Sequence, residues 1–235
     1  MLSIRNLTKT YGNKTAVSNL SLEVEAGDIC AFIGHNGAGK TTTIKAAVGI
    51  IDFEGDILID GVSIKENPIL CKQKFAYIPD NPDLYEYLTG IQYLNFIADI
   101  FKISTAERKA RIEKLGEELS LSSELANLIS SYSHGMKQKL AVIGALLHEP
   151  KLLILDEPFV GLDPEAVVTL KAIMRRICKE GGAVFFSTHV LDVAEKLCNK
   201  AAIIRDGRLL AYGGMNELTD GKSLEDVFME VVRHA

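Results

Sequence analysis

The stretch Gly34-His35-Asn36-Gly37-Ala38-Gly39-Lys40-Thr41-Thr42 matches the phosphate-binding loop pattern G-x-x-x-x-G-K-[ST] at every fixed position. Residues 28–33 before it are short and almost wholly apolar, which is typical of a strand buried on both faces of a parallel sheet. Residues 41–51 after it are expected to form a helix. Glycines let the backbone turn tightly, so that N–H groups and the helix N-terminus point at phosphates. The stretch therefore predicts a nucleoside triphosphate site with Mg²⁺.

Two side chains of this loop carry specific expectations. Lys40 is predicted to reach the β- and γ-phosphates, and the Thr41 hydroxyl to ligate Mg²⁺. The alternative is a glycine-rich turn with a chance Lys-Thr, but the strand before and the helix after favour the phosphate site. The predicted nucleotide-binding residues of the loop are Gly34, Asn36, Gly37, Ala38, Gly39, Lys40, Thr41 and Thr42.

Composition narrows the function classes. The 235 residues are 47% hydrophobic and 24% charged, and the net charge of −5 argues against a basic surface for nucleic acid or anionic lipid. The four cysteines are widely spaced with no C-x-x-C, which predicts reduced thiols rather than a zinc site or disulfides. The longest apolar run, residues 140–147, is far shorter than the ~20 residues of a membrane-spanning helix. Residues 1–5 do not begin a signal peptide, so we expect a cytoplasmic chain.

The order of predicted elements indicates an α/β P-loop ATPase core with a mainly parallel central sheet and an N-terminal antiparallel β-subdomain. Apolar patterns predict strands over 2–7, 20–25, 56–59, 74–78, 152–155, 183–187 and 201–205. Helical spacing runs from about 84 to 148, and Ser104-Thr105-Ala106-Glu107 is a capping-box signature within it. We therefore expect residues 1–82 and 149–235 to form the core and residues 83–148 an inserted α-helical subdomain.

Polar residues follow two of the predicted strands. Asp156 and Glu157 end the strand 152–155, and open α/β sheets bind ligands at the carboxyl ends of their strands. Asp156 is predicted to support Mg²⁺, and Glu157 to polarise the attacking water. His189 ends the next strand, so it should emerge on the same rim as Lys40 and hydrogen-bond the γ-phosphate. The alternatives are an ordinary acidic turn and a surface histidine.

Two further positions stay ambiguous from the residues alone. Tyr11 is either a core aromatic or a surface on which a base stacks. Ser133 and Gly135 start a helix that runs to Leu147 and offer a hydroxyl and N–H groups to an anion. An N-cap without a ligand is the preferred interpretation of that pattern on physical grounds.

Six motifs in order, GHNGAGKTT, YIPD, YSHGMKQ, LLILDEP, GLDP and STH, resemble the nucleotide-binding subunit of an ABC transporter over essentially the whole chain. The resemblance implies that Tyr11 stacks on adenine, and that Ser133 and Gly135 cap the γ-phosphate of an ATP held by the opposite subunit. It also implies that Asp163 communicates across a dimer enclosing two ATP molecules. Residues 223–228 are similar to the drug- and antibiotic-exporter branch.

The chain departs from the family pattern at three motifs. The usual Leu-Ser-Gly-Gly-Gln is here Tyr-Ser-His-Gly-Met over 132–136, and Val160 replaces the usual Ser before Gly-Leu-Asp. A protonated His134 near phosphate would add favourable charge, whereas the alternative is a side chain turned to solvent. Asp80 replaces the usual Gln, and its carboxylate can coordinate Mg²⁺ directly or through water.

The resemblance implies an ATP-hydrolysing motor subunit of an exporter, with ATP and Mg²⁺ as cofactors and Lys40, Glu157 and His189 as catalytic residues. Its expected partners are an integral-membrane permease and a second ATPase subunit, the same or different, at the cytoplasmic face of the membrane, with no nucleic acid. The alternatives are a non-transport ABC ATPase of translation or DNA maintenance and a small-molecule P-loop kinase. The former usually resembles tandem cassettes or has long coiled coils; the latter leaves the helical insertion unexplained.

Residues 80–96 are predicted to meet the permease, because this region of relatives receives a short cytoplasmic helix. Tyr85 and Tyr87 precede the helical pattern, so they are expected to be exposed. Tyr93 and Phe96 lie within the pattern and are expected to be buried. Exposed tyrosines combine a large contact area with a polar tip, which suits an interface. The alternative is that both exposed candidates pack on the helical subdomain.

Overall fold

A computed structural model describes residues 1–233 as two compact units. The core unit contains residues 1–77, 151–158 and 174 onward, and the helical unit contains 78–150 and 159–173. The sequence prediction assigned 78–82 and 159–173 to the core instead. Within the helical unit, an ion pair between Lys139 and Asp163 joins segment 159–173 to the preceding helices.

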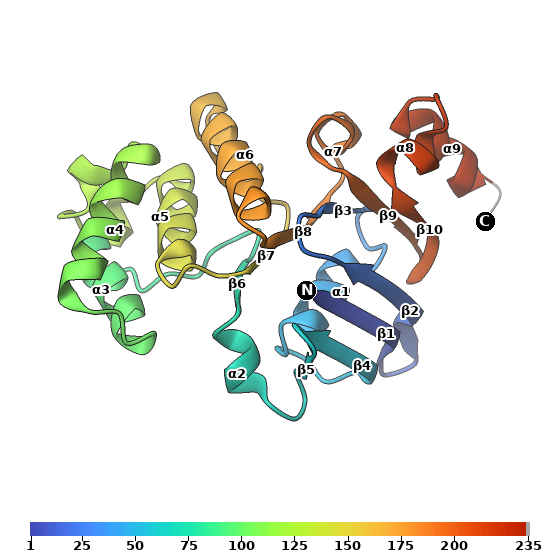
Figure 1. Ribbon diagram of the computed structural model, residues 1–235, viewed down its shortest axis with the longest axis horizontal. Helices are drawn as coiled ribbons and strands as arrows, with labels where there is room; N and C mark the ends of the chain where they lie inside the picture. Colours follow the sequence, from blue (N-terminus) through green and yellow to red (C-terminus); the bar gives the residue numbers. More distant parts are fainter. Residues whose placement is uncertain (234–235) are drawn as a thin grey trace. The chain divides into compact units, whose positions relative to one another are not determined.

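The core unit begins with an antiparallel sheet, shown from blue to teal in Figure 1. Its strand order is β2-β1-β4-β5, and its strands are β1 (Leu2–Tyr11), β2 (Lys14–Val24), β4 (Glu54–Ile59) and β5 (Val62–Ser63). Leu20, Leu22 and Val24 are buried, as their alternation with polar residues predicts. The β1–β2 hairpin is longer than predicted and turns directly after Tyr11.

The second sheet of the core unit has the order β10-β9-β3-β8-β7-β6. Its strands are β3 (Ile29–Ile33), β6 (Phe75–Ile78), β7 (Leu152–Leu155), β8 (Ala183–Thr188), β9 (Lys200–Arg205) and β10 (Arg208–Gly214). Strand β3 runs parallel to β8 and β9, β7 runs parallel to β8, and β10 is antiparallel to β9. Every residue of β3, β7 and β8 is buried, which explains their apolar runs. The expected mainly parallel sheet is confirmed.

One apolar core joins both sheets and α1 (Lys40–Ala47). Ile44 of α1 belongs to the same buried cluster as Leu22 of the antiparallel sheet and Phe185 of the second sheet. Helix α1 is shorter than predicted because Gly49 adopts a φ of 70° and its N–H donates to the Ala46 carbonyl. The core unit also contains α2 (Pro68–Lys72), α7 (Leu191–Leu197), α8 (Met215–Thr219) and α9 (Leu224–Arg233). Helix α6 (Pro164–Lys179) belongs to the core unit from residue 174 onward and to the helical unit before it.

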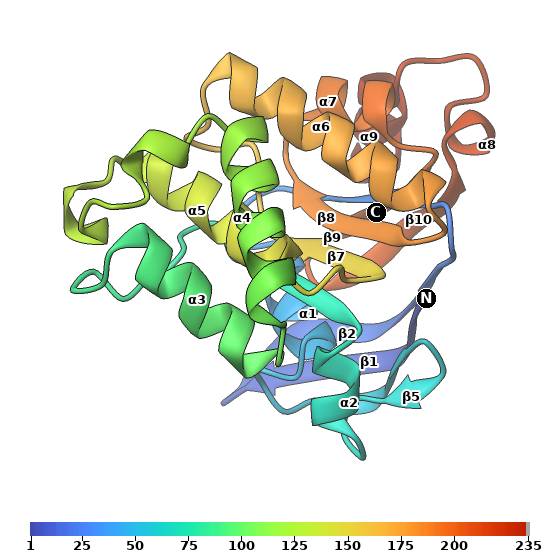
Figure 2. The same ribbon diagram turned by 60° about the vertical axis from the view of Figure 1, so that its left-hand side comes forward.

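The helical unit is built on α3 (Gly90–Ile100), α4 (Thr105–Glu118) and α5 (His134–Leu146), which lie side by side in Figure 2. Two 3₁₀ turns, Ser122–Glu124 and Ile129–Ser131, connect α4 to α5. The predicted capping box is confirmed, because the Ser104 and Glu107 side chains each accept the other's backbone N–H.

Two aromatic residues of α3 differ in exposure. Tyr93 is half-buried, where full burial is expected from the sequence, and this burial raises its pKa to about 12. Phe96 is 42% exposed, so the prediction that it is buried is wrong. Tyr85 and Tyr87 are exposed as predicted.

Across residues 1–233, none of the helices has the length and apolar character that crossing a membrane requires.

Candidate functional site

The phosphate loop connects β3 to α1, and two of its glycines leave no room for a Cβ atom. Gly39 has a φ of 109°, and a Cβ there would lie 2.7 Å from the Ala16 carbonyl oxygen. A Cβ on Gly34 would lie 2.5 Å from the Ile204 carbonyl oxygen. Helix α1 has no side-chain cap and no acidic residue in its first turn. Its N-terminus therefore suits a bound anion.

Lys40 is buried, and its ammonium already lies among oxygens. Its Nζ donates to the Gly34 carbonyl at 2.7 Å and lies 3.4 Å from the His35 carbonyl oxygen. It also lies 3.4 Å from Oε1 of Glu157. A cation surrounded by oxygens in a glycine loop can exchange neutral carbonyls for charged phosphate oxygens, which bind it more strongly.

The turn between β9 and β10 is hydrogen-bonded to the phosphate loop. The Gly207 N–H donates to the Ala38 carbonyl at 2.9 Å, and the Gly207 carbonyl accepts from the Ser18 N–H at 2.8 Å. The sequence predicts a hairpin turn at Asp206-Gly207 but not this contact, since the bonded residues are far apart in the chain. The turn fixes the loop on its buried side.

Asp156 is almost fully buried at the end of β7, and its carboxylate is only partly satisfied by protein. The Ser187 hydroxyl donates to Oδ1 and accepts from the Glu157 N–H at 3.0 Å. Oδ2 has no hydrogen-bond partner among residues 1–233. A buried carboxylate oxygen left unpaired is costly unless a cation or its water meets it, so this residue fits Mg²⁺. The sequence prediction missed Ser187.

Glu157 lies between the two other predicted catalytic side chains. Its Oε2 is 3.0 Å from Nδ1 of His189, and its Oε1 faces Lys40. Its φ of 46° places it in the left-handed region, which is uncommon for a residue other than glycine. The predicted convergence of Lys40, Glu157 and His189 at the carboxyl ends of the strands is therefore observed. Asp156 directly precedes Glu157 on the same strand end.

The remaining predicted residues of the core unit lie at its surface or line the loop. Tyr11 is 49% exposed, so the core-aromatic alternative is wrong, and Lys9 Nζ lies 5.0 Å from the centre of its ring. An exposed ring next to a cation remains available for base stacking. The side chains of Asn36 and Thr41 are exposed, as is Gly37, Thr42 is half-buried, and Ala38 is buried.

Within the helical unit, Ser133 caps α5, and its Oγ accepts from the Met136 N–H at 3.3 Å. The ring of His134 lies against Gly161, where an added Cβ would collide with it. His134 is also exposed, as the alternative of a side chain turned to solvent predicts. Gly135 approaches the same residue, since a Cβ there would lie 3.0 Å from the Gly161 carbonyl oxygen.

The loop that follows Gly161 is also tied to α5. Lys139 Nζ lies 2.8 Å from Oδ2 of Asp163, and this bond, with one from the Ala166 N–H, lowers the pKa of the Asp163 carboxyl. Asp80 is exposed in the same unit, and its Oδ1 accepts from the Asn81 N–H at 2.8 Å.

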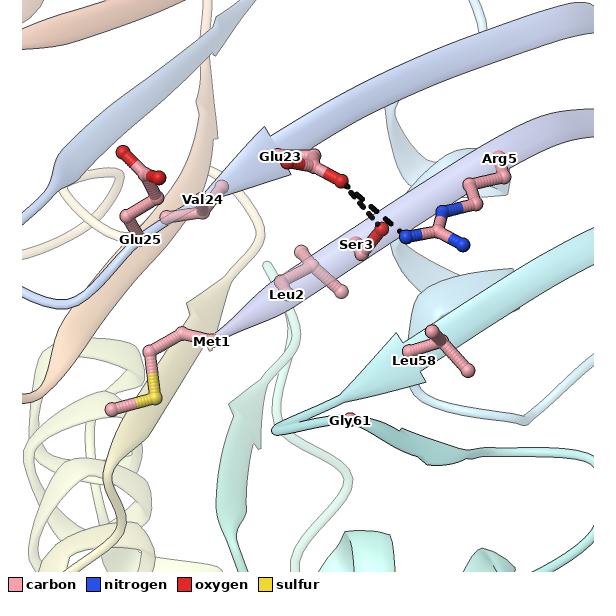
Figure 3. Close-up of a pocket in the computed structure, with 9 residues that line it drawn as sticks. All are labelled: Met1, Leu2, Ser3, Arg5, Glu23, Val24, Glu25, Leu58 and Gly61. Carbon is pink, nitrogen blue, oxygen red and sulfur yellow. Dashed lines mark hydrogen bonds and ion pairs between the residues drawn. The ribbon is translucent and has the colours of Figure 1, made fainter.

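An open hollow of about 260 Å³ lies on the antiparallel sheet (Figure 3). It is lined by Met1, Leu2, Ser3, Arg5, Glu23, Val24, Glu25, Leu58 and Gly61. Glu23 already accepts a hydrogen bond from Ser3 at 3.0 Å and pairs with Arg5 at 3.8 Å. None of these residues belongs to the phosphate loop or to the rim that carries Asp156, so the hollow is separate from the predicted site.

Comparison with known proteins agrees with this geometry. The family model described as ABC transporter matches residues 17–160. The ABC-type transporter ATP-binding protein EcsA of Bacillus subtilis (strain 168) is 36% identical over 239 residues, covering 99% of this chain and 97% of the relative. The bacitracin transport ATP-binding protein BcrA of Enterococcus faecalis is 35% identical, covering 93% and 70%. A solved ATP-binding subunit of an ABC transporter has a TM-score of 0.94 at 35% identity, covering 99% of both chains.

These matches cover more than half of the chain, and they coincide with the phosphate loop, the carboxylates after β7 and the helical unit. The chain belongs to the ABC transporter family, as an ATP-binding subunit that hydrolyses ATP.

Proposed function

We propose that this subunit is the motor of an exporter, which binds Mg-ATP and pairs with a second ATPase subunit to drive a separate membrane permease. The convergence of Lys40 and His189 on the Glu157 carboxylate carries the catalytic part of this proposal. A relative named Nod factor export ATP-binding protein I, 33% identical over 94% of this chain, supports an export direction.

In the proposed reaction, the chain's own residues position ATP and water. Lys40 exchanges its carbonyl partners for the β- and γ-phosphate oxygens, and Tyr11 offers the exposed face of its ring to adenine. Glu157 orients and deprotonates the attacking water, and His189 exchanges its contact with Glu157 for a hydrogen bond to the γ-phosphate. When bound, Mg²⁺ neutralises charge on the phosphates, and Thr41, Asp156 and Asp80 are its proposed ligands.

The proposed dimer uses the helical unit of each subunit against the nucleotide of the other. Ser133 and the N–H of Gly135 lie at the N-terminus of α5, where a hydroxyl and a helix dipole favour a phosphate. In the bound state, the Ser133 hydroxyl donates to the γ-phosphate while its Oγ still accepts from the Met136 N–H. His134 holds this helix start against Gly161.

The proposed permease contact is an aromatic patch formed by Tyr85, Tyr87 and Phe96. The Tyr85 ring lies 5.9 Å from that of Tyr87 and meets that of Phe96 edge-on at 5.6 Å. All three are more than 40% exposed. Exposed aromatic clusters of this kind are typical of interfaces with a partner.

The test is the double substitution Tyr85→Ala with Tyr87→Ala in a complex with the membrane permease that co-purifies with the wild-type subunit. We expect ATP affinity and melting temperature near wild type, but weaker co-purification and lower transport. The matched control is Ile69→Ala with Leu70→Ala, which removes exposed apolar side chains from α2 of the core unit. A stable double variant that assembles and transports normally would refute the docking assignment. A large fall in melting temperature would instead support packing of both rings on the helical unit.

A further inference from the structure

Main-chain hydrogen bonds join the aromatic patch to the segment that leads into Ser133. The Ile129 N–H donates to the Leu88 carbonyl at 2.9 Å, and the Ser130 N–H donates to the Glu86 carbonyl at 3.1 Å. Glu86 stands between the two exposed tyrosines of the patch in sequence. The backbone that carries the patch is thus bonded directly to the 3₁₀ turn that precedes the phosphate-capping serine.

A side-chain pair makes a second connection from the same loop. The Glu86 carboxylate binds the ammonium group of Lys137, in the first turn of α5. The Lys137 N–H donates to the Ser133 carbonyl at 3.0 Å. The segment that carries Tyr85 and Tyr87 is therefore connected to Ser133 through one ion pair and one helical hydrogen bond.

The ion pair has an electrostatic reason to form. The first turn of a helix lies at the positive end of the helix dipole, which repels a cation and attracts an anion. Glu86 supplies the anion that Lys137 lacks within its own helix, since the first turn of α5 contains no acidic residue. The side chain of Lys137 is 23% exposed and that of Glu86 is 58% exposed, so only the Lys137 end of the pair is shielded from solvent.

We propose that Glu86 and Lys137 are positioning residues that couple the aromatic patch to Ser133, so that a partner bound at the patch and phosphate capped at Ser133 favour one another. This inference deepens the proposed function and rests on it. Coupling between two sites is reciprocal in free energy. ATP-driven dimerisation must therefore raise the affinity of the patch for its partner, and we expect the surroundings of the patch to change even when no permease is present.

This reciprocity gives a test on the isolated subunit. The chain contains no tryptophan, so Tyr87→Trp places a single fluorescent reporter in the patch. In a Glu157→Gln background, which is expected to preserve the ATP-bound dimer, saturating Mg-ATP should shift the Trp emission. Adding Glu86→Gln or Lys137→Met should remove the shift and weaken dimerisation about fivefold, the upper limit for a largely exposed ion pair and the lower end of coupling between sites. ATP affinity of the monomer and the melting temperature should change little.

The double variant Glu86→Gln, Lys137→Met should lose no more than either single variant, because both remove the same pair. The matched control is the exposed ion pair of Lys109 and Glu113 on α4, 3.9 Å apart, whose neutralisation should leave the shift intact. A shift that survives Glu86→Gln, or a dimer that forms without any shift in the parent, would overturn the coupling while leaving the proposed function standing. Absence of an ATP-driven dimer would contradict the proposed function itself, and the coupling with it.

Discussion

The substitution Ser187→Ala should lower both the stability and the turnover of the subunit, although Ser187 is not a proposed nucleotide contact. Ser187 is fully buried, and its hydroxyl connects the Asp156 carboxylate to the backbone of Glu157. It donates to Oδ1 of Asp156 and accepts from the N–H of Glu157. Its removal leaves Asp156 without that donor and leaves a backbone N–H without its acceptor at a residue in the left-handed region.

The size of the effect follows from these two bonds. A hydrogen bond to a charged group contributes about 1.5–3 kcal/mol, and an unsatisfied buried donor costs about 1–3 kcal/mol, so allowing for relaxation we expect a loss of about 3 kcal/mol. In a protein of this size, each kcal/mol lowers the melting temperature by about 2–4 °C, which gives about 6–12 °C. Because Glu157 shifts with its backbone, turnover should fall about 100-fold.

Calorimetry and a steady-state phosphate-release assay measure both effects. The matched control is Thr188→Val, which removes the neighbouring buried hydroxyl, whose one partner among the described residues is the Val190 N–H at 3.0 Å. This control should cost about 1 kcal/mol and leave turnover within about threefold of wild type. A Ser187→Ala protein with wild-type turnover and melting temperature would refute the role given to this hydroxyl.

Lys40→Ala should raise the dissociation constant of Mg-ATP more than about 100-fold by calorimetric titration, because it removes the charge-assisted phosphate contact; near-normal binding would count against the site. Lys139→Met should raise the pKa of the Asp163 carboxyl toward its ordinary value of 3.8 in an NMR titration. Since that pKa is lowered in the folded protein, the pair stabilises the fold above about pH 4 and is lost as the pH falls further, and an unchanged titration curve would contradict it. Asp28→Asn should lower the unfolding free energy by about 3 kcal/mol in a denaturant titration, because the buried carboxylate binds Lys200 at 2.8 Å; a change below about 1 kcal/mol would show that the pair is dispensable.

The sequence predicts those parts of the fold and site that depend on local pattern. The phosphate loop is contiguous, and Glu157 and His189 each end an apolar strand, so parallel strands bring both to one rim. The capping box at Ser104 is likewise a local signal, and the structure confirms it.

Features made by contacts between distant segments were not predictable in this way. In the sequence, Ser187 is one small residue in an apolar strand. Its bonds to the Asp156 carboxylate and the Glu157 N–H depend on the pairing of β7 with β8. The bond from Gly207 to Ala38 joins a hairpin turn to a loop far earlier in the chain. Phe96 has helical spacing with buried neighbours, but periodicity does not fix how wide the buried face of α3 is.

The most direct test of the proposed motor is the mass of Glu157→Gln in solution with saturating Mg-ATP, measured by size-exclusion chromatography with light scattering. Glutamine preserves the shape of the side chain but removes the base, so ATP should persist between the phosphate loop of one subunit and Ser133 of the other. We predict a dimer with Mg-ATP and a monomer with Mg-ADP, and a protein that remains monomeric at saturating Mg-ATP would contradict the two-subunit sandwich.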